Sequence, residues 1–198
     1  MKLIAGLGNP GARYKNTRHN TGFMTVEAFR KEKELPPFKA RGNFAFPITQ
    51  GLVNGEKVLL VKPAQTGAKP TYMNESGKAI AALKKYYKVK DKDIVVVHDD
   101  ADIELGKIRI VKNKGAAGHK GVRSVIQHLG TKNFIRFRVG IQPQEGAANL
   151  DRKGLEEFVL KRFTKKEKTL IKESVQKCVS ALDSLIREGL GKTMNKFN

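Results

Sequence analysis

GLGNPGARYKNTRHNTG, at residues 6–22, is the stretch that says most about the fold of this 198-residue chain. It follows directly on the apolar run of residues 2–5. An apolar run that ends in a glycine–proline turn predicts a strand, here over residues 2–7, that stops at the edge of a sheet. Ligands of open α/β folds bind at such an edge. The stretch therefore places side-chain amides and the imidazole of His19 where a binding site is expected.

Residues 6–11 also match the GxGxxG pattern of dinucleotide-binding loops, but their context argues against that function. The dinucleotide fingerprint needs an apolar helix that begins inside the loop and an acidic residue at the end of the next strand. Residues 12–19 are polar instead, and no acidic strand end follows at the required distance. The pattern therefore does not predict a dinucleotide cofactor.

Length and composition favour a single globular domain. A chain of 198 residues with 39% hydrophobic residues can bury a sizeable core, and no linker or internal repeat divides it. No apolar run approaches the length of a membrane-spanning helix, and the N-terminus lacks the pattern of a signal peptide. The single cysteine, Cys178, excludes an intramolecular disulfide. We therefore expect a cytoplasmic protein.

The charge balance points to an anionic partner. The chain has 39 Lys and Arg against 19 Asp and Glu, a formal net charge of +20. Residues 105–144 contain basic residues but no acidic ones, and a field of one sign attracts phosphate backbones whatever their sequence. A basic surface that serves only solubility remains the alternative. The basic residues of this segment are Lys107, Arg109, Lys112, Lys114, Lys120, Arg123, Lys132, Arg136 and Arg138.

Strand and helix patterns alternate along the chain and predict an α/β fold. The Asn54-Gly55 turn predicts an antiparallel hairpin, which makes the sheet a mixed one. The capping box of Thr164 and Glu167 begins a last helix, which ends at Gly189. We expect one domain over residues 1–189 and a flexible basic tail over residues 190–198. Further strands are expected at residues 43–49, 57–62, 94–98, 107–111 and 134–141, and further helices at residues 23–33, 74–88 and 122–129.

His19 is the best candidate for a general base, because the pKa of an imidazole suits proton transfer near neutral pH. The segment His98-Asp99-Asp100-Ala101-Asp102 follows a buried strand and offers carboxylates at the edge of the sheet. One of these could accept a hydrogen bond from His19 and set its tautomer. A metal site at the carboxylates, a polar turn after the strand, and a capping or surface role for His19 remain alternatives.

Two further motifs each open a helix. Asn74 could cap the helix that follows it, and its amide could also bind a carbonyl or a water. The glycine-rich loop of residues 115–121 could bind an anion through its backbone N–H groups, or serve as a flexible linker. No GxSxG motif occurs, and Cys178 lies on the apolar stripe of the last helix. A hydrolase built on this chain is therefore expected to activate water without an acyl-enzyme.

Taken together, four segments resemble the motifs of bacterial peptidyl-tRNA hydrolases, and the resemblance spans roughly the whole chain. They are residues 6–22, the YMNESGKA of residues 72–79, the DDAD of residues 99–102 and the GHKG of residues 118–121. The resemblance implies a single α/β domain with a twisted mixed, mostly parallel sheet flanked by helices. It also implies a cytoplasmic monomer that cleaves the ester between a peptide and the 3′-terminal ribose of tRNA, and so recycles tRNA from aborted translation. No cofactor, metal or protein partner is implied.

The resemblance also implies a role for each matched residue. His19 would activate water, Asp99 would hold His19 in its basic form, and Asn9 would position the ester. Residues 145–151 would form a mobile lid. Contacts to the peptide or the tRNA 3′ end are expected from Tyr14, Tyr72, Asn74 and Lys120, and further tRNA contacts from His119, Lys107, Arg109, Lys112 and Arg138.

Three departures from the family pattern stand out. Lys120 follows His119 where the family usually has asparagine, and Ala116-Ala117 make the loop less glycine-rich than usual. Residues 62–70 look like an expanded form of the segment that leads into the YMN motif.

Two other functions remain open on the residues alone. One is a non-catalytic RNA-binding protein, because a plastid relative on the same fold serves as an intron-splicing factor. The other is a metal-dependent phosphoesterase that uses Asp99, Asp100 and Asp102. The presence of Asn9, His19, Asn74 and Asp99 together favours the hydrolase.

Overall fold

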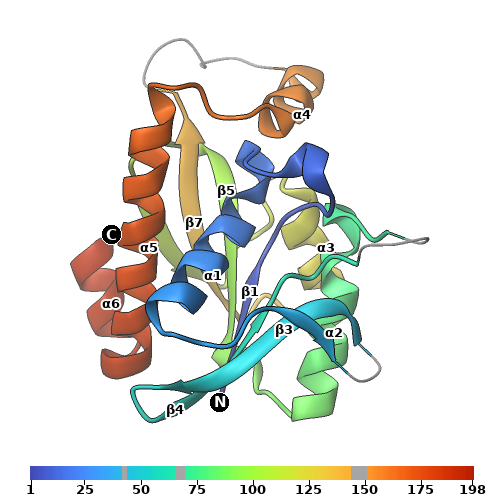
Figure 1. The fold of residues 1–198 in the computed structure, drawn as a ribbon, viewed down its shortest axis with the longest axis vertical. Helices are drawn as coiled ribbons and strands as arrows, with labels where there is room; N and C mark the ends of the chain where they lie inside the picture. The colour runs from blue at the N-terminus through green and yellow to red at the C-terminus, as the bar shows by residue number, and fades with distance from the viewer. Residues whose placement is uncertain (42–43, 66–69, 144–150) are drawn as a thin grey trace.

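A seven-stranded sheet forms the centre of the molecule and carries helices on both faces (Figure 1). The computed structural model describes residues 1–41, 44–65, 70–143 and 151–198. The strand order is β2-β3-β4-β1-β5-β7-β6, in which the four strands β4, β1, β5 and β7 run parallel and the outer strands are antiparallel to their neighbours. The strands are β1 (Lys2–Gly6), β2 (Lys39–Arg41), β3 (Phe44–Val53), β4 (Glu56–Val61), β5 (Ile94–Glu104), β6 (Ile108–Lys112) and β7 (Ile135–Gln142).

The predicted hairpin is confirmed, and its turn explains the register. Val53 pairs with Glu56, so Asn54 and Gly55 form a two-residue loop. Both loop residues have positive φ, 52° and 77°, which is the backbone conformation of a type I′ turn. The mixed, mostly parallel sheet expected for this chain is therefore present.

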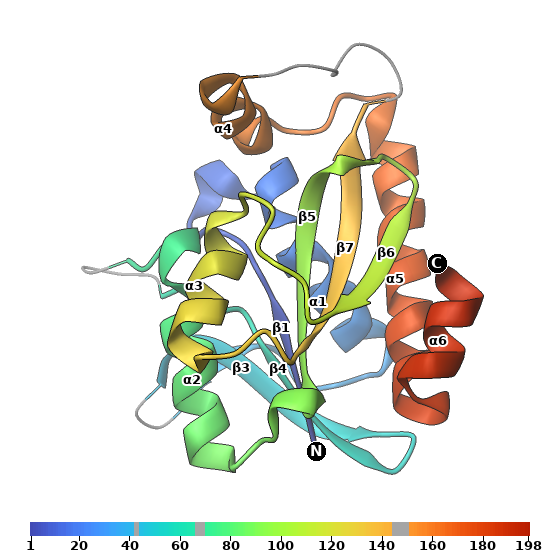
Figure 2. The ribbon, with the colours of Figure 1, turned by 180° about the vertical axis from the view of Figure 1, so that it is seen from behind.

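Two hydrophobic cores lie on opposite faces of the sheet, because successive side chains of a strand point to opposite sides. Ile4 of β1 belongs to the core beneath α1 and α5, whereas Leu3 and Ala5 belong to the core beneath α2 and α3. Figures 1 and 2 show these two helical layers from either side. The helices are α1 (Thr21–Glu32), α2 (Ser76–Tyr87), α3 (Lys120–Leu129), α4 (Arg152–Leu160), α5 (Glu167–Glu188) and α6 (Leu190–Phe197).

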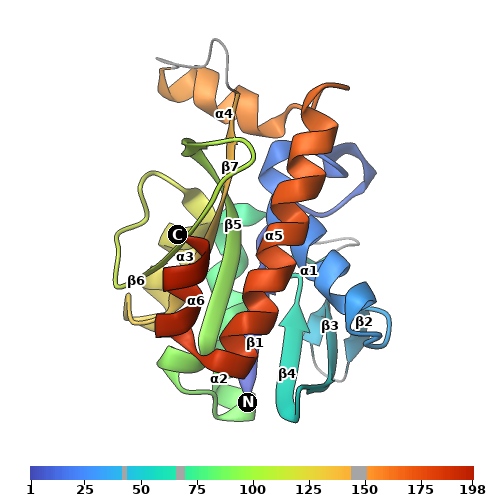
Figure 3. The same ribbon diagram turned by 90° about the vertical axis from the view of Figure 1, so that its left-hand side faces the viewer.

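Helix α5 runs the length of the sheet and matches its predicted pattern (Figure 3). The capping box is present: Thr164 N–H donates to Glu167 Oε2 at 2.7 Å, and Glu167 N–H donates to Thr164 Oγ1 at 3.3 Å. Gly189 ends the helix with a φ of 83°. Cys178 is buried in the apolar face of α5, and burial raises the pKa of its thiol.

The structure differs from the expected elements in three places. The segment of residues 190–198, expected as a flexible tail, contains helix α6 (Leu190–Phe197), and the side chain of Asn198 exchanges two hydrogen bonds with the backbone of Ile110. Strand β5 continues to Glu104, so the polar segment of residues 98–102 is strand and not a turn. Strand β2 and helix α4 were not predicted from the sequence. Strand β2 is only three residues long, and α4 makes few buried contacts.

Helix α4 lies across the carboxyl ends of the parallel strands (Figure 3). Among the residues that the structure describes, no helix is long and apolar enough to cross a membrane.

Candidate active site

A cleft of about 780 Å³ opens at the carboxyl ends of the central strands, with α4 as one of its walls. This is the edge at which the sequence predicted a site, and it is where ligands of open α/β sheets bind. The cleft brings together residues from β5, the first turns of the chain and the loop before α3. Its lining includes the predicted site residues Asn9, Tyr14, His19, Tyr72, Asn74, Asp99, His119 and Lys120.

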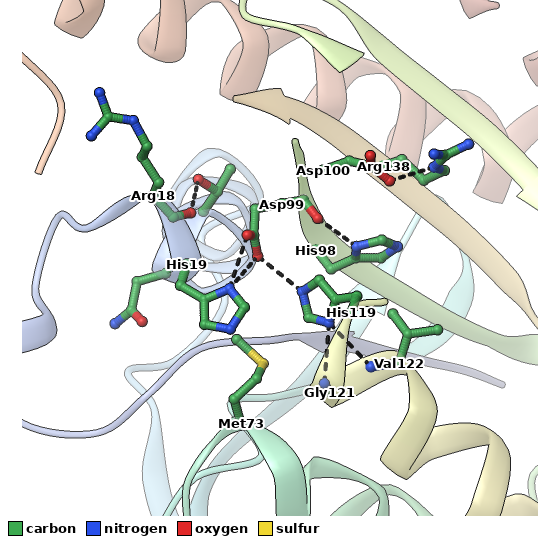
Figure 4. Close-up of polar contacts among 12 residues, drawn as sticks. Arg18, His19, Met73, His98, Asp99, Asp100, His119, Gly121, Val122 and Arg138 are labelled. Carbon is green, nitrogen blue, oxygen red and sulfur yellow. Dashed lines mark hydrogen bonds and ion pairs between the residues drawn. The ribbon is translucent and has the colours of Figure 1, made fainter. Parts of the chain in front are cut away.

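His19 and Asp99 meet at the floor of the cleft (Figure 4). His19 lies in the short turn η2 (Arg18–Asn20), and its Nδ1 is 3.0 Å and 2.9 Å from the two carboxylate oxygens of Asp99. A carboxylate only accepts hydrogen bonds, so Nδ1 carries the proton and Nε2 keeps its lone pair. The Asp99 side chain is 2% exposed and that of His19 is 11% exposed, so the ring reaches solvent through the cleft.

His119 makes a second contact to the same carboxylate. Its Nε2 is 3.0 Å from Asp99 Oδ1, and its Nδ1 accepts the backbone N–H groups of Gly121 at 3.1 Å and Val122 at 3.2 Å. Because two N–H donors point at Nδ1, that atom is unprotonated and Nε2–H donates to Asp99. The N-terminus of α3 therefore sets the tautomer of His119 (Figure 4).

The two imidazoles determine the charge of Asp99. Burial alone would raise the pKa of this carboxyl, but His19 and His119 more than offset that effect, so its pKa lies well below the ordinary value. Asp99 is therefore an anion that accepts a hydrogen bond from each ring. A fixed anion behind one ring nitrogen leaves the other nitrogen available as a proton acceptor.

His98 lies beside this pair but is directed away from the cleft. Its Nδ1 donates to the backbone carbonyl of Asp99 at 2.7 Å, and its ring packs edge-on against His119 with centroids 4.7 Å apart. Burial, followed by the neighbouring His119, lowers the pKa of His98 well below the ordinary value. Its Nε2 is buried and has no hydrogen-bond partner among the described residues. His98 is thus a neutral packing partner of His119.

Asn9 is held rigidly at the end of β1. Its backbone N–H donates to Asn20 Oδ1 at 2.8 Å, and Asn20 Nδ2 donates back to the Asn9 carbonyl at 3.0 Å. The side-chain Oδ1 of Asn9 accepts the backbone N–H of Met73 at 2.8 Å. These bonds orient the amide so that its NH₂ group is the part left for a ligand in the cleft. Asn20 lies within the motif of residues 6–22, but no role was predicted for it from the sequence.

The capping role considered for Asn74 is wrong. Asn74 lies inside the short turn η3 (Met73–Glu75), and the residue that precedes α2 is Glu75, whose side chain makes no capping hydrogen bond. The side chain of Asn74 is exposed and lines the cleft. Nearby, the rings of Tyr14 and Tyr72 meet edge-on with centroids 6.3 Å apart and form an aromatic rim.

Asp99 and Asp100 of β5 bind different partners. Asp100 Oδ2 accepts Arg138 Nε at 2.5 Å, and Asp100 Oδ1 accepts the backbone N–H of Asp102 at 3.1 Å. Within the described parts of the chain, the one group with metal-ligand spacing is His19, Asp99 and His119, whose ligand atoms lie within 4.8 Å of one another. These atoms already pair imidazole N–H groups with a carboxylate. The geometry therefore fits a hydrogen-bonded triad better than a cation.

The predicted phosphate contacts are spread over a wider surface than the cleft. Lys107 pairs with Glu104 at 2.6 Å, and Arg109 donates to the backbone carbonyl of Asn198 at 2.7 Å. The structure places Lys107, Arg109 and Lys112 on or next to the edge strand β6, and Arg138 on β7. None of the four lines the cleft.

Lys120 does line the cleft, and its ammonium pairs with Glu156 of α4 at 3.0 Å. Helix α4 also brings Leu155, Val159 and Leu160 to the cleft, which the sequence analysis missed. The apolar spacing of these residues was the available signal. Of the lid predicted at residues 145–151, only Asp151 lies within the described residues, and it caps α4 by accepting Gly154 N–H at 2.8 Å. Residues 66–69 of the expanded segment also lie outside them.

Comparison with known proteins finds similarity along the whole chain. The family model described as peptidyl-tRNA hydrolase matches residues 3–198. The peptidyl-tRNA hydrolase of Bacillus subtilis is 44% identical over 100% of this chain and 98% of its own length. That of Levilactobacillus brevis is 40% identical over 100% of both chains. A crystal structure of peptidyl-tRNA hydrolase from Acinetobacter baumannii has a TM-score of 0.88 and 30% identity, and covers 100% of this chain and 94% of that one.

Proposed function

The chain belongs to the peptidyl-tRNA hydrolase family, and on this premise we propose that it hydrolyses the ester between a peptide, or an N-blocked aminoacyl group, and the 3′-terminal ribose of tRNA. The observation that carries the proposal is the pair of His19 and Asp99 at the floor of a cleft, beside the oriented amide of Asn9. This reaction recycles tRNA from aborted translation in the cytoplasm. The protein acts as a monomer without a cofactor.

Water is the nucleophile in this proposal. His19 Nε2 accepts a proton from a bound water as its oxygen attacks the ester carbonyl, and Asp99 stabilises the imidazolium that forms. The tetrahedral intermediate then expels the ribose 3′ oxygen, which takes the proton from His19. The products are a peptide with a free carboxyl group and a tRNA with a free 3′ end. The buried Cys178 is in no position to serve as a nucleophile.

The oxyanion of the intermediate needs hydrogen-bond donors that are already in place. The NH₂ group of Asn9 fits this role, because Met73 holds the other end of the same amide and Asn20 holds the backbone. A donor that is fixed before the reaction needs no reorganisation when charge develops. The exposed amide of Asn74 lines the same cleft, and in this proposal it binds the adjacent peptide carbonyl.

Recognition of the tRNA combines stacking and charge. The aromatic rim of Tyr14 and Tyr72 suits the unpaired bases at the 3′ end, since bases stack on aromatic rings whatever their identity. The basic surface of Lys107, Arg109, Lys112 and Arg138 suits the phosphates of the acceptor stem, which proteins recognise mainly by shape and charge. Lys120 and His119 line the cleft itself.

The decisive test is release of a labelled N-acetyl-aminoacyl group from tRNA, measured beside the unblocked aminoacyl-tRNA with EDTA present. We expect cleavage of the blocked substrate alone. Tight tRNA binding without cleavage would indicate an RNA-binding protein, and loss of cleavage only when EDTA is added would indicate metal-dependent chemistry.

A further inference from the structure

The residue next to the proposed base is a buried arginine that the proposed reaction leaves without a role. Arg18 is 4% exposed, and its side chain extends away from that of His19 (Figure 4). Its Nη2 donates to both carboxylate oxygens of Glu167, at 2.7 Å and 2.8 Å, and its Nη1 donates to the backbone carbonyl of Arg162 at 2.9 Å. The two terminal nitrogens of one planar guanidinium thus bond Glu167 and the Arg162 carbonyl at the same time, which the single nitrogen of a lysine ammonium is less suited to do.

Two aromatic rings enclose the same guanidinium. Its central carbon lies 4.4 Å from the ring centroid of Phe158 in α4 and 5.1 Å from that of Phe163. Phe158 therefore contacts Arg18, while the next residue, Val159, lines the cleft. Helix α4 is thus held on one side by Arg18 and presents another side to the ligand.

The backbone reinforces this connection. The Arg18 N–H donates to the carbonyl of Lys161 at 3.1 Å, and Thr17 forms a bridge with Arg162. Residues 17–18 are thereby joined to the segment between α4 and α5. Glu167 in turn belongs to the capping box that begins α5. One guanidinium accordingly links the turn of His19 to two other elements.

Stability alone accounts poorly for this arrangement. Replacing a buried ion pair by apolar residues of similar volume is often neutral or stabilising. The Nε of Arg18 is also buried and has no hydrogen-bond partner among the described residues, which is a cost. What the arrangement does supply is a defined position for turn η2 relative to α4.

We propose that Arg18 is a positioning residue, whose guanidinium fixes the distance between the base His19 and the wall of the cleft formed by α4. The proposal rests on the proposed role of His19 as the base. Because a misplacement of about 1 Å can lower a rate by about 10²-fold, loss of Arg18 should reduce kcat far more than it raises KM.

The test compares Arg18→Ala with a matched control, Arg30→Ala. Arg30 also forms an ion pair, with Glu27 at 2.8 Å, and donates to the Leu35 carbonyl at 2.9 Å, but it lies near the end of α1 that is remote from the cleft. We expect kcat of Arg18→Ala to fall by about 10²-fold. Arg30→Ala should keep the kcat of the unchanged protein at a temperature where both variants are folded.

Chemical rescue separates positioning from a loss of folded protein. Millimolar guanidinium ion should restore kcat of Arg18→Ala in a saturable manner, because it can occupy the space between Glu167 and the two rings. Arg18→Lys should keep only part of the kcat, since a single ammonium nitrogen does not reproduce the two separate nitrogens that bond Glu167 and the Arg162 carbonyl. Equal kcat values for Arg18→Ala and the unchanged protein, or equal losses in both alanine variants, would overturn the proposal.

Glu167→Gln covers the case in which Arg18→Ala does not fold. Glutamine keeps the volume and an acceptor for the Thr164 N–H, but removes the bidentate carboxylate. We expect a fall in kcat with KM nearly unchanged, and an unchanged kcat would contradict the role of Arg18. The unchanged protein and His19→Ala are assayed in parallel. Absence of cleavage by the unchanged protein would refute the proposed function. Full activity of His19→Ala would refute the role of His19 as the base, and with it the positioning role of Arg18.

Discussion

Asp99 and Asp100 are neighbours on β5, yet the structure uses them in different ways. Asp99 accepts hydrogen bonds from two imidazoles at the floor of the cleft, whereas Asp100 pairs with the guanidinium of Arg138. A guanidinium is always charged, so the pair of Asp100 and Arg138 is permanent. An imidazole gains and loses a proton near neutral pH, so the pair of Asp99 and His19 can take part in proton transfer. The partner of a carboxylate, more than its burial, decides whether it serves structure or chemistry.

His19→Ala removes the imidazole from this comparison and should have the largest effect. We expect turnover of N-acetyl-aminoacyl-tRNA to fall by about 10²- to 10⁴-fold, the usual contribution of a general base. The affinity for uncharged tRNA should not change, because His19 is not part of the basic surface. Single-turnover hydrolysis and filter binding measure the two quantities. Equal losses in both would mean that His19 is a binding residue.

Asp99→Asn and Asp100→Asn test the comparison directly. Asp99→Asn should lower kcat by up to about 10⁴-fold, because an amide can no longer fix the tautomer of His19. Asp100→Asn should leave kcat close to that of the unchanged protein but lower the free energy of unfolding by about 1–3 kcal/mol, because Arg138 loses its anionic partner. Kinetics and urea unfolding of both variants provide the measurement. A larger loss of kcat in Asp100→Asn would reverse the assignment of the two carboxylates.

His98, the neighbour of Asp99 on β5, makes the stability of the folded protein depend on pH. The pKa of His98 is lowered in the folded protein, so the unfolded chain binds a proton below the ordinary pKa of about 6.5 while the folded protein does not. The free energy of unfolding should therefore fall as the pH decreases below that value, by up to about 1.4 kcal/mol per pH unit. His98→Gln should flatten this slope. An identical slope in urea unfolding at pH 5 to 7 would mean that His98 is not the group responsible.

Lys120→Asn should have the smallest effect, because the ion pair of Lys120 and Glu156 is about half exposed and surface pairs contribute little. If Lys120 leaves Glu156 and binds a tRNA phosphate in the complex, the variant should change how tRNA affinity depends on salt. The slope of log K against log salt concentration should become smaller by about one. Glu156→Gln is the matched control, since it frees Lys120 from this pair and should not reduce the slope. An unchanged slope in Lys120→Asn would exclude the phosphate contact.

Particular residues show how far sequence patterns reach. The hairpin at Asn54-Gly55 and the capping box of Thr164 were predictable, because each depends on residues that are adjacent or three apart. Helix α6 was not predicted, because its anchor is the contact between Asn198 and Ile110 on the edge strand, 88 residues away. Helix α4 was not predicted, because its short apolar face packs on Arg18 and lines a cleft and does not fill a core.

The sequence by itself determined the alternation of strands and helices, the hairpin, and His19 as the candidate base next to the end of the first strand. The residue patterns did not determine which carboxylate of β5 would contact His19. The tertiary structure decided this, because β1 and β5 pair in parallel with Gly6 beside Val97, and because alternate residues of a strand face opposite sides. The structure alone also joined Arg18 to Glu167, 149 residues away. Contacts between distant residues depend on strand register and helix packing, which no local pattern encodes.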